Sequence, residues 1–250
     1  MNISGSQKTS GNHLTASPIS FERILVGTDF SEPAQLAFDI ALEFAEQFGS
    51  HLSIAHAISL MLPSIASAGI VPEAVDALVQ SAKEELDKVI RLHRTNVASI
   101  EKVVAFGGAE EVLLGAVREK KIDLLVLGTH ASLGIARIAL GSVAESVMRH
   151  VPCPVLIAGP RCQRISNLFR SILFATDLTT TGTRAARYAA ALAEQFQSML
   201  TMFHAIEKKE SVAGGRREEC ENASRLQLEL LLPEAADLWC RPHTELAYGD

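Results

Sequence analysis

The chain has 250 residues, a length that fits one large domain or two ordinary ones. Its residues are 48% hydrophobic and 21% charged, which predicts a globular protein with buried cores, and its formal net charge of −6 gives no electrostatic reason to expect nucleic-acid binding. No stretch is apolar for long enough to span a membrane, and residues 1–20 lack the apolar segment of a secretory signal. We therefore expect a cytoplasmic protein that starts with a disordered polar tail over residues 1–20.

Residues 21–160 predict one domain in which strands and helices alternate. The expected strands are short apolar runs with many β-branched residues, and they cover residues 24–27, 51–57, 100–106, 123–127 and 155–158. The expected helices are marked by caps and by apolar residues at helical spacing, and they cover residues 31–48, 72–94, 110–120 and 141–150. The alternation predicts an α/β fold with an open parallel five-stranded sheet, helices on both faces and right-handed crossovers.

The second part of the chain repeats the first. Residues 172–206 align with residues 24–58 at a constant offset of 148 positions, with 15 identities in 35 positions. Chance would give about two, so the pattern indicates a duplicated domain. We expect a linker over residues 161–170 and an incomplete second copy over residues 171–250, in which a helix (211–232) and a strand (244–248) are followed by no counterpart of the later elements.

The incomplete copy leaves its first strand as an apolar edge, which proteins usually avoid. We therefore expect either that the chain is a fragment of a longer tandem protein or that a partner covers this edge. The four cysteines form no C-x-x-C pair and are expected to be reduced, as packing or incidental thiols: Cys153, Cys162, Cys220 and Cys240.

A glycine-containing segment follows the fourth expected strand. Residues 127–143 read LGTHASLGIARIALGSV. Together with Thr28-Asp29 after the first strand and the sequence PCPV before the last strand, this segment resembles the universal stress protein family. The ATP-binding branch of that family has the pattern Gly-x2-Gly-x9-Gly-Ser/Thr, and the corresponding positions here are Gly128, Ala131, Gly141 and Ser142.

The resemblance covers residues 21–160, and residues 170–250 in part. It implies an adenine-nucleotide α-hydrolase-like sheet with strand order 3-2-1-4-5, and ATP as the ligand, with or without Mg²⁺ or Mn²⁺. By the same resemblance, Asp29 and Ala57 border the adenosine, next to Thr28 at the end of the first strand. The residues expected to border the phosphates are Gly128, His130, Ala131, Gly141, Ser142 and Val143.

General chemistry supports this location. Open parallel sheets bind ligands at the carboxyl ends of their strands where the strand order reverses, here between the first and fourth strands. The helix that begins at Gly141-Ser142 has free amide groups and a dipole that favour phosphate, and glycine lets the backbone approach an anion closely. Ser142 can add a hydroxyl donor.

A second hypothesis explains the same residues without a ligand. The glycines then make a tight connection between strand and helix, Asp29 caps the following turn as Asp177 does in the second copy, and the protein acts through protein contacts. Ala131 and the incomplete second copy favour this hypothesis, because a Cβ at a position with positive φ costs roughly 1–2 kcal/mol. His56 and His204, at equivalent strand ends, are expected to be structural.

No Ser-His-Asp pattern, metal-ligand cluster or Walker lysine motif appears in the sequence. The leading hypothesis is therefore an ATP-binding stress or regulatory protein with little or no turnover. An adenylate-forming enzyme or ATP pyrophosphatase would need a glycine-rich loop after the first strand, where residues 27–33 read GTDFSEP. In the family the fifth strands pair between domains, which predicts a homodimer through Val155–Ala158.

Overall fold

The computed structural model describes residues 19–59, 72–93, 97, 99–129, 141–159, 162, 169–207, 217–233, 236, 240 and 242–249. The chain divides into two compact units, which we call the first unit (residues 20–164) and the second unit (residues 165–250). Within the described residues, no helix is both long and apolar enough to cross a membrane. The predictions for residues 1–18 of the tail, for His130 and for Ala131 concern residues outside the described ranges.

The first unit contains the predicted parallel five-stranded sheet, with the strand order β3-β2-β1-β4-β5. Its strands are β1 (Arg23–Gly27), β2 (His51–Ile58), β3 (Ile100–Phe106), β4 (Leu124–Gly128) and β5 (Val155–Ala158). Ile24 of β1 lies beside Leu52 on one side and beside Leu124 on the other. The order reverses between β1 and β4, so the connections that follow these two paired strands turn to opposite faces of the sheet and leave a crevice outside their carboxyl ends.

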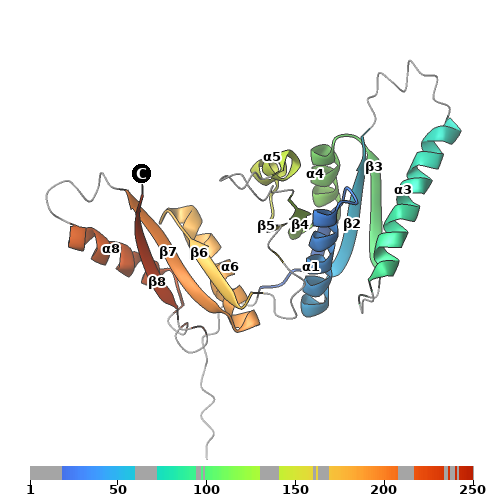
Figure 1. The fold of residues 1–250 in the computed structure, drawn as a ribbon. Helices are drawn as coiled ribbons and strands as arrows, with labels where there is room; N and C mark the ends of the chain where they lie inside the picture. Colours follow the sequence, from blue (N-terminus) through green and yellow to red (C-terminus); the bar gives the residue numbers. More distant parts are fainter. Residues whose placement is uncertain are drawn as a thin grey trace, which may run out of the picture. The chain divides into compact units, whose positions relative to one another are not determined.

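Helices cover both faces of this sheet (Figure 1): α1 (Glu32–Phe48), α3 (Pro72–Leu92), α4 (Ala109–Lys120) and α5 (Ser142–His150). Right-handed crossovers place α1 and α3 on one face and α4 and α5 on the other. The predicted limits of α1 are confirmed, because the Ser31 hydroxyl accepts a hydrogen bond from the Ala34 amide and Gly49 ends the helix with a φ of 66°. On the α4 side the core includes Leu25 and Leu125.

The second unit contains a smaller parallel sheet with the order β6-β7-β8. Its elements are β6 (Ser171–Ala175), α6 (Thr180–Phe196), β7 (Met199–Glu207), α8 (Arg217–Leu230) and β8 (His243–Gly249). Ser171 lies beside Met199 in this sheet, as Arg23 lies beside His51 in the first, so both pairs keep the offset of 148. The part of α8 predicted before residue 217 lies outside the described residues, and the helix ends two residues earlier than predicted.

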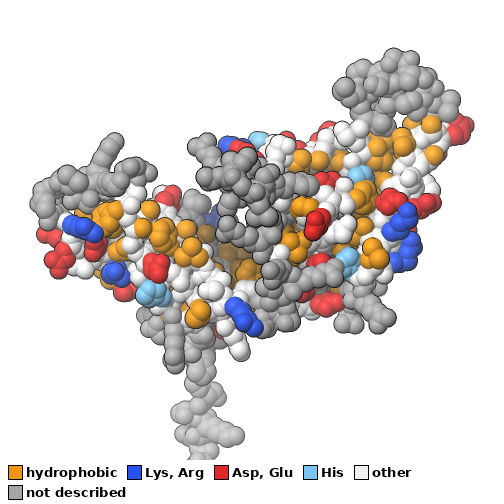
Figure 2. Space-filling view, viewed as in Figure 1, with side chains coloured by type: hydrophobic (Ala, Val, Ile, Leu, Met, Phe, Trp, Pro, Cys, Tyr) orange, Lys and Arg blue, Asp and Glu red, His pale blue; other side chains and the backbone are white. Residues whose placement is uncertain are grey.

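One face of the second sheet has no helix on it among the described residues. Its packed face buries Phe174, Leu200 and Met202 in a core with α6 and α8. On the other face, Leu173 is 63% exposed, whereas its counterpart Leu25 in the first unit is fully buried against the side of the sheet that α4 covers. Figure 2 shows hydrophobic side chains gathered over this sheet.

Candidate functional site

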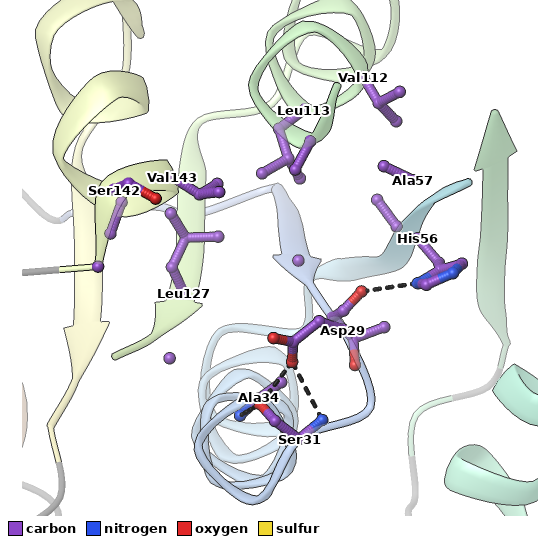
Figure 3. Close-up of a pocket in the computed structure, with 17 residues that line it drawn as sticks. Asp29, Ser31, Ala34, His56, Ala57, Val112, Leu113, Leu127, Ser142 and Val143 are labelled. Atoms are coloured by element: carbon purple, nitrogen blue, oxygen red, sulfur yellow. Dashed lines mark hydrogen bonds between the residues drawn. The ribbon is translucent and has the colours of Figure 1, made fainter. Parts of the chain in front are cut away.

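A cavity of about 310 Å³ lies at the carboxyl ends of the strands of the first sheet, next to β1 and β4 (Figure 3). The ends of β1, β2 and β4 and the first residues of α1, α4 and α5 line it. The structure brings together around this cavity all the predicted site residues that it describes: Thr28, Asp29, Ala57, Gly128, Gly141, Ser142 and Val143. The sheet topology therefore assembles residues that are more than 100 positions apart in the sequence.

The apolar wall of the cavity was not predicted. It consists of small or branched side chains that cover the inner part of the crevice: Ala34, Ala55, Val112, Leu113, Leu127 and Ala144. The residue types of this wall are those of any buried apolar position in the sequence. Only the fold distinguishes these residues, because it brings them together at the carboxyl ends of the strands. A wall of this kind suits the flat aromatic face of a ring such as a nucleobase.

The turn after β1 is held by its own side chains. The Phe30 amide donates to Thr28 Oγ1 at 3.0 Å, and Phe30 has a φ of 65°. The carboxylate of Asp29 accepts hydrogen bonds from the Ser31 amide, at 3.0 Å, and from the Ser31 hydroxyl. Asp29 therefore caps the turn into α1 while it also lines the cavity.

The second unit repeats this turn. Asp177 accepts hydrogen bonds from the Thr179 amide at 3.0 Å and from the Thr179 hydroxyl at 2.8 Å, and Leu178 has a φ of 62°. These hydrogen bonds, that from the backbone first, lower the pKa of Asp177 below its usual value. Among the described residues of the second unit no counterpart of α5 exists. The turn therefore forms without a counterpart of α5 among the described residues.

The two histidines behave as predicted. His56 Nδ1 lies 2.9 Å from the carbonyl oxygen of Thr28, so Nδ1 carries the proton and donates. The His56 ring also packs against Phe30, with ring centroids 4.4 Å apart and ring planes tilted by 39°. His204 makes the equivalent contact with Thr176 at 2.8 Å. Each histidine ties the end of its second strand to the end of its first strand, and His56 also lines the cavity.

The structure explains why glycine is needed at one of the two glycine positions of the predicted phosphate motif and not at the other. A Cβ at Gly128 would lie 2.3 Å from the carbonyl oxygen of Pro33, so this glycine lets the first turn of α1 pack directly on β4. Gly141 has a φ of −55° and a ψ of 146°, which any residue can adopt, and a Cβ there would meet nothing within 4 Å among the residues that the structure describes. Packing therefore explains Gly128, and it leaves Gly141 unexplained.

Helix α5 starts at the cavity without a side-chain cap. Gly141 is its N-cap and has no side chain to bind the amide groups of the first turn. The next residues, Ser142, Val143 and Ala144, all line the cavity. Amide groups at such a helix start favour an anion, both as hydrogen-bond donors and through the helix dipole.

Thr129, which was not among the predicted residues, anchors this helix start. Its amide donates to the carbonyl of Ala158 on β5 at 3.0 Å, and its buried hydroxyl lies 3.4 Å from the Gly141 amide. The residue thus joins the ends of β4 and β5 to the start of α5. A threonine directly after Gly128 in the glycine-containing segment was the signal that could have identified it.

A second uncapped helix start, that of α4, lies at the rim of the cavity. Its N-cap is Gly108, and its first residue, Ala109, lines the cavity. Glu110 and Glu111 follow in the first turn and put negative charge there. In α5 the acidic residue of the first turn, Glu145, is paired with Arg149 at 2.6 Å. The start of α5 is therefore the more favourable place for an anion.

Comparison with known proteins gives the same fold. Residues 20–159 match the profile of the Universal stress protein family. A universal stress protein of Methanocaldococcus jannaschii is 28% identical over 141 residues, which are 55% of this chain and 81% of that protein. The universal stress protein YxiE of Bacillus subtilis is 29% identical over 145 residues, 55% of this chain and 98% of that protein. A solved universal stress protein from Archaeoglobus fulgidus superimposes with a TM-score of 0.65 at 20% identity over 91% of this chain and 79% of that chain, a likeness of fold.

Proposed function

The chain belongs to the universal stress protein family, and from this premise we propose that its first unit binds ATP in the cavity between β1 and β4. Family membership supports a role in the stress response, and ATP binding would make the protein a nucleotide-dependent regulator. The observation that carries the proposal is the uncapped start of α5, whose residues 142–144 line one side of a cavity with an apolar wall on another. An apolar wall for a base and free amide groups for phosphates are what a nucleotide needs.

The ligand would lie with its adenosine beside Ala57 and the turn at Thr28-Asp29, and with its phosphates at Gly141 and Ser142. Among the described residues, no group of three or more His, Cys, Asp or Glu side chains could hold a metal ion. Mg²⁺ or Mn²⁺ would therefore be bound mainly through the phosphates of the nucleotide, as is usual for Mg²⁺.

We propose low turnover, which the described lining of the cavity supports. Its titratable side chains are those of Asp29 and His56, and both are engaged in backbone hydrogen bonds of the strand ends. Rapid phosphoryl transfer needs a base or water-positioning residue and cations on the transferred phosphate. The described lining contains no arginine or lysine, so we propose storage and signalling of a bound nucleotide rather than fast hydrolysis.

A second candidate function is favoured by a specific observation. Packing against Pro33 explains Gly128 without any ligand, and the Asp29 turn recurs at Asp177 without α5. The same fold would then act through protein contacts alone. Nucleotide that co-purifies with the protein would distinguish the two candidates in favour of ATP.

We also propose that two chains pair through β5 in the cytoplasm. The strand Val155–Ala158 is the outermost strand of the first sheet and pairs with β4 on one side. Its other edge is suited to pairing with the same strand of a second chain. The cytoplasmic location remains a prediction from the sequence.

The proposed function is tested by titrating the purified chain with labelled ATP, beside variants of Gly141 and Ser142. Saturable binding that these variants weaken is the expected result. If the unaltered protein shows no saturable binding at millimolar ATP, the nucleotide site is refuted and the second candidate function remains.

A further inference from the structure

Glu110, the second residue of α4, connects the start of that helix to α5. The Ser146 hydroxyl donates to Glu110 Oε2 at 2.6 Å, and His150 Nδ1 lies 3.0 Å from Glu110 Oε1. Because the same Nδ1 lies 3.0 Å from the Ser146 carbonyl oxygen, it carries a proton and faces two acceptors. These hydrogen bonds, that of Ser146 first, hold the pKa of Glu110 below its usual value of 4.5, so it is a carboxylate at neutral pH.

The contact lies close to the proposed phosphate position. Ser146 follows Ser142 by four positions, so both lie on one face of α5, and Ser142 lines the cavity. On the other helix, Ala109 lines the cavity directly before Glu110. The hydrogen bond from Ser146 to Glu110 therefore fixes α5 relative to α4, directly after the residues of α5 that line the cavity.

We propose that Glu110 is a positioning residue: through Ser146 and His150 it holds the start of α5 in the orientation that directs its amide groups at a phosphate. This inference rests on the proposed function and adds a residue to it. It concerns the phosphate part of the ligand and leaves the base and ribose unaffected.

The sign of the effect separates positioning from charge. A carboxylate near an anion site repels phosphate, so removal of its charge alone would tighten ATP binding. Loss of positioning would weaken it. Glu111 is a matched control, since it is the next residue of the same helix turn, carries the same charge and makes no hydrogen bond or ion pair with any described residue.

The experiment measures the dissociation constants for ATP and for adenosine with the unaltered chain and with three variants, Glu110→Ala, Ser146→Ala and Glu111→Ala. We expect Glu110→Ala to weaken ATP binding about tenfold, Ser146→Ala somewhat less, and both to leave adenosine within about twofold. Glu111→Ala should leave ATP unchanged or slightly tighter. Hydrogen exchange of the amides of residues 142–147 should speed up in Glu110→Ala and stay unchanged in Glu111→Ala.

Each outcome decides a separate point. If the unaltered chain binds ATP and Glu110→Ala binds it equally or more tightly, the positioning role is refuted and the proposed function stands. Equal loss of ATP and adenosine binding would show a general structural effect and would also refute it. If the unaltered chain fails to bind ATP, the proposed function is refuted, and unchanged exchange in α5 would refute the contact between the helices as well.

Discussion

Replacing Gly141 with Asp tests the proposed phosphate site and preserves the fold. The backbone at Gly141 has dihedral angles that suit a helix N-cap, and a Cβ there would meet no atom of the described residues within 4 Å. Asp is among the best N-cap residues, so the variant should gain a few tenths of a kcal/mol of stability from the cap. The same carboxylate would bind the amide groups of the first turn of α5 and occupy the place of a phosphate.

The expected loss of affinity follows from the charge. An ionised carboxylate about 4 Å from a phosphate oxygen costs about 4 kcal/mol at an effective dielectric constant of about 20. That energy corresponds to nearly a thousandfold in Kd, since each ~1.4 kcal/mol is a factor of ten. Screening in a site open to physiological salt reduces the effect, so we expect a loss of about a hundredfold.

The assay is isothermal titration calorimetry with ATP and with adenosine, accompanied by thermal unfolding. Gly108→Asp is the matched control, because Gly108 is the N-cap of α4, also without a side-chain cap, and a Cβ there would likewise meet no described atom within 4 Å. Gly141→Asp should lose affinity for ATP, keep its affinity for adenosine and unfold at no lower a temperature than the unaltered chain. Gly108→Asp should lose far less affinity for ATP. ATP affinity that survives in Gly141→Asp, or that is lost only in Gly108→Asp, would refute the assignment of the phosphate to α5.

Four further predictions concern the fold and the assembly. Gly128→Ala should destabilise the first unit by about 2–3 kcal/mol in thermal unfolding, because its Cβ would lie 2.3 Å from the α1 backbone. Leu25→Ala should cost about 2–5 kcal/mol and Leu173→Ala less than about 1 kcal/mol, since the first side chain is fully buried and the second 63% exposed; equal losses would mean that something covers the second. Glu110 should make the chain more stable than Glu110→Ala above pH 4.5, and this difference should disappear as the pH falls through the lowered pKa of Glu110 in the folded state. Melting curves of both proteins at pH values from neutral downward would test this. Light scattering at micromolar concentration should show a dimer paired through Val155–Ala158, and a monomer would contradict it.

The fold could be predicted from the sequence because local and global signals agree. Short β-branched runs alternate with amphipathic helices, and the caps at Ser31 and Gly49 fix the limits of α1. The resemblance supplied the strand order, which periodicity alone does not contain. Once that order is known, the position of a crevice between the ends of β1 and β4 follows from the topology.

The details of the site could not be predicted, because they depend on distances between elements. The sequence presents Gly128 and Gly141 as two members of one motif, yet the structure shows that a neighbouring helix requires the first, whereas no described residue packs against a Cβ at the second. Thr129 and Glu110 have ordinary residue types for their places, and their roles appear only when the partners on β5 and α5 are in position. The spacing of a motif therefore predicts which residues lie close together in the fold, but it does not predict which contacts require each of them.

The second unit acts as an internal control for the first. It has the same aspartate turn at Asp177 and the same histidine contact at His204, each with hydrogen bonds of similar length to those of Asp29 and His56. These shared features are therefore explained by how a first strand connects to its helix and to the second strand. A ligand specific to the first unit must depend on what the described residues of the second unit lack, which is β4, α4 and the uncapped start of α5 at Gly141. For that reason a change at Gly141, rather than at either aspartate, is the decisive test of nucleotide binding.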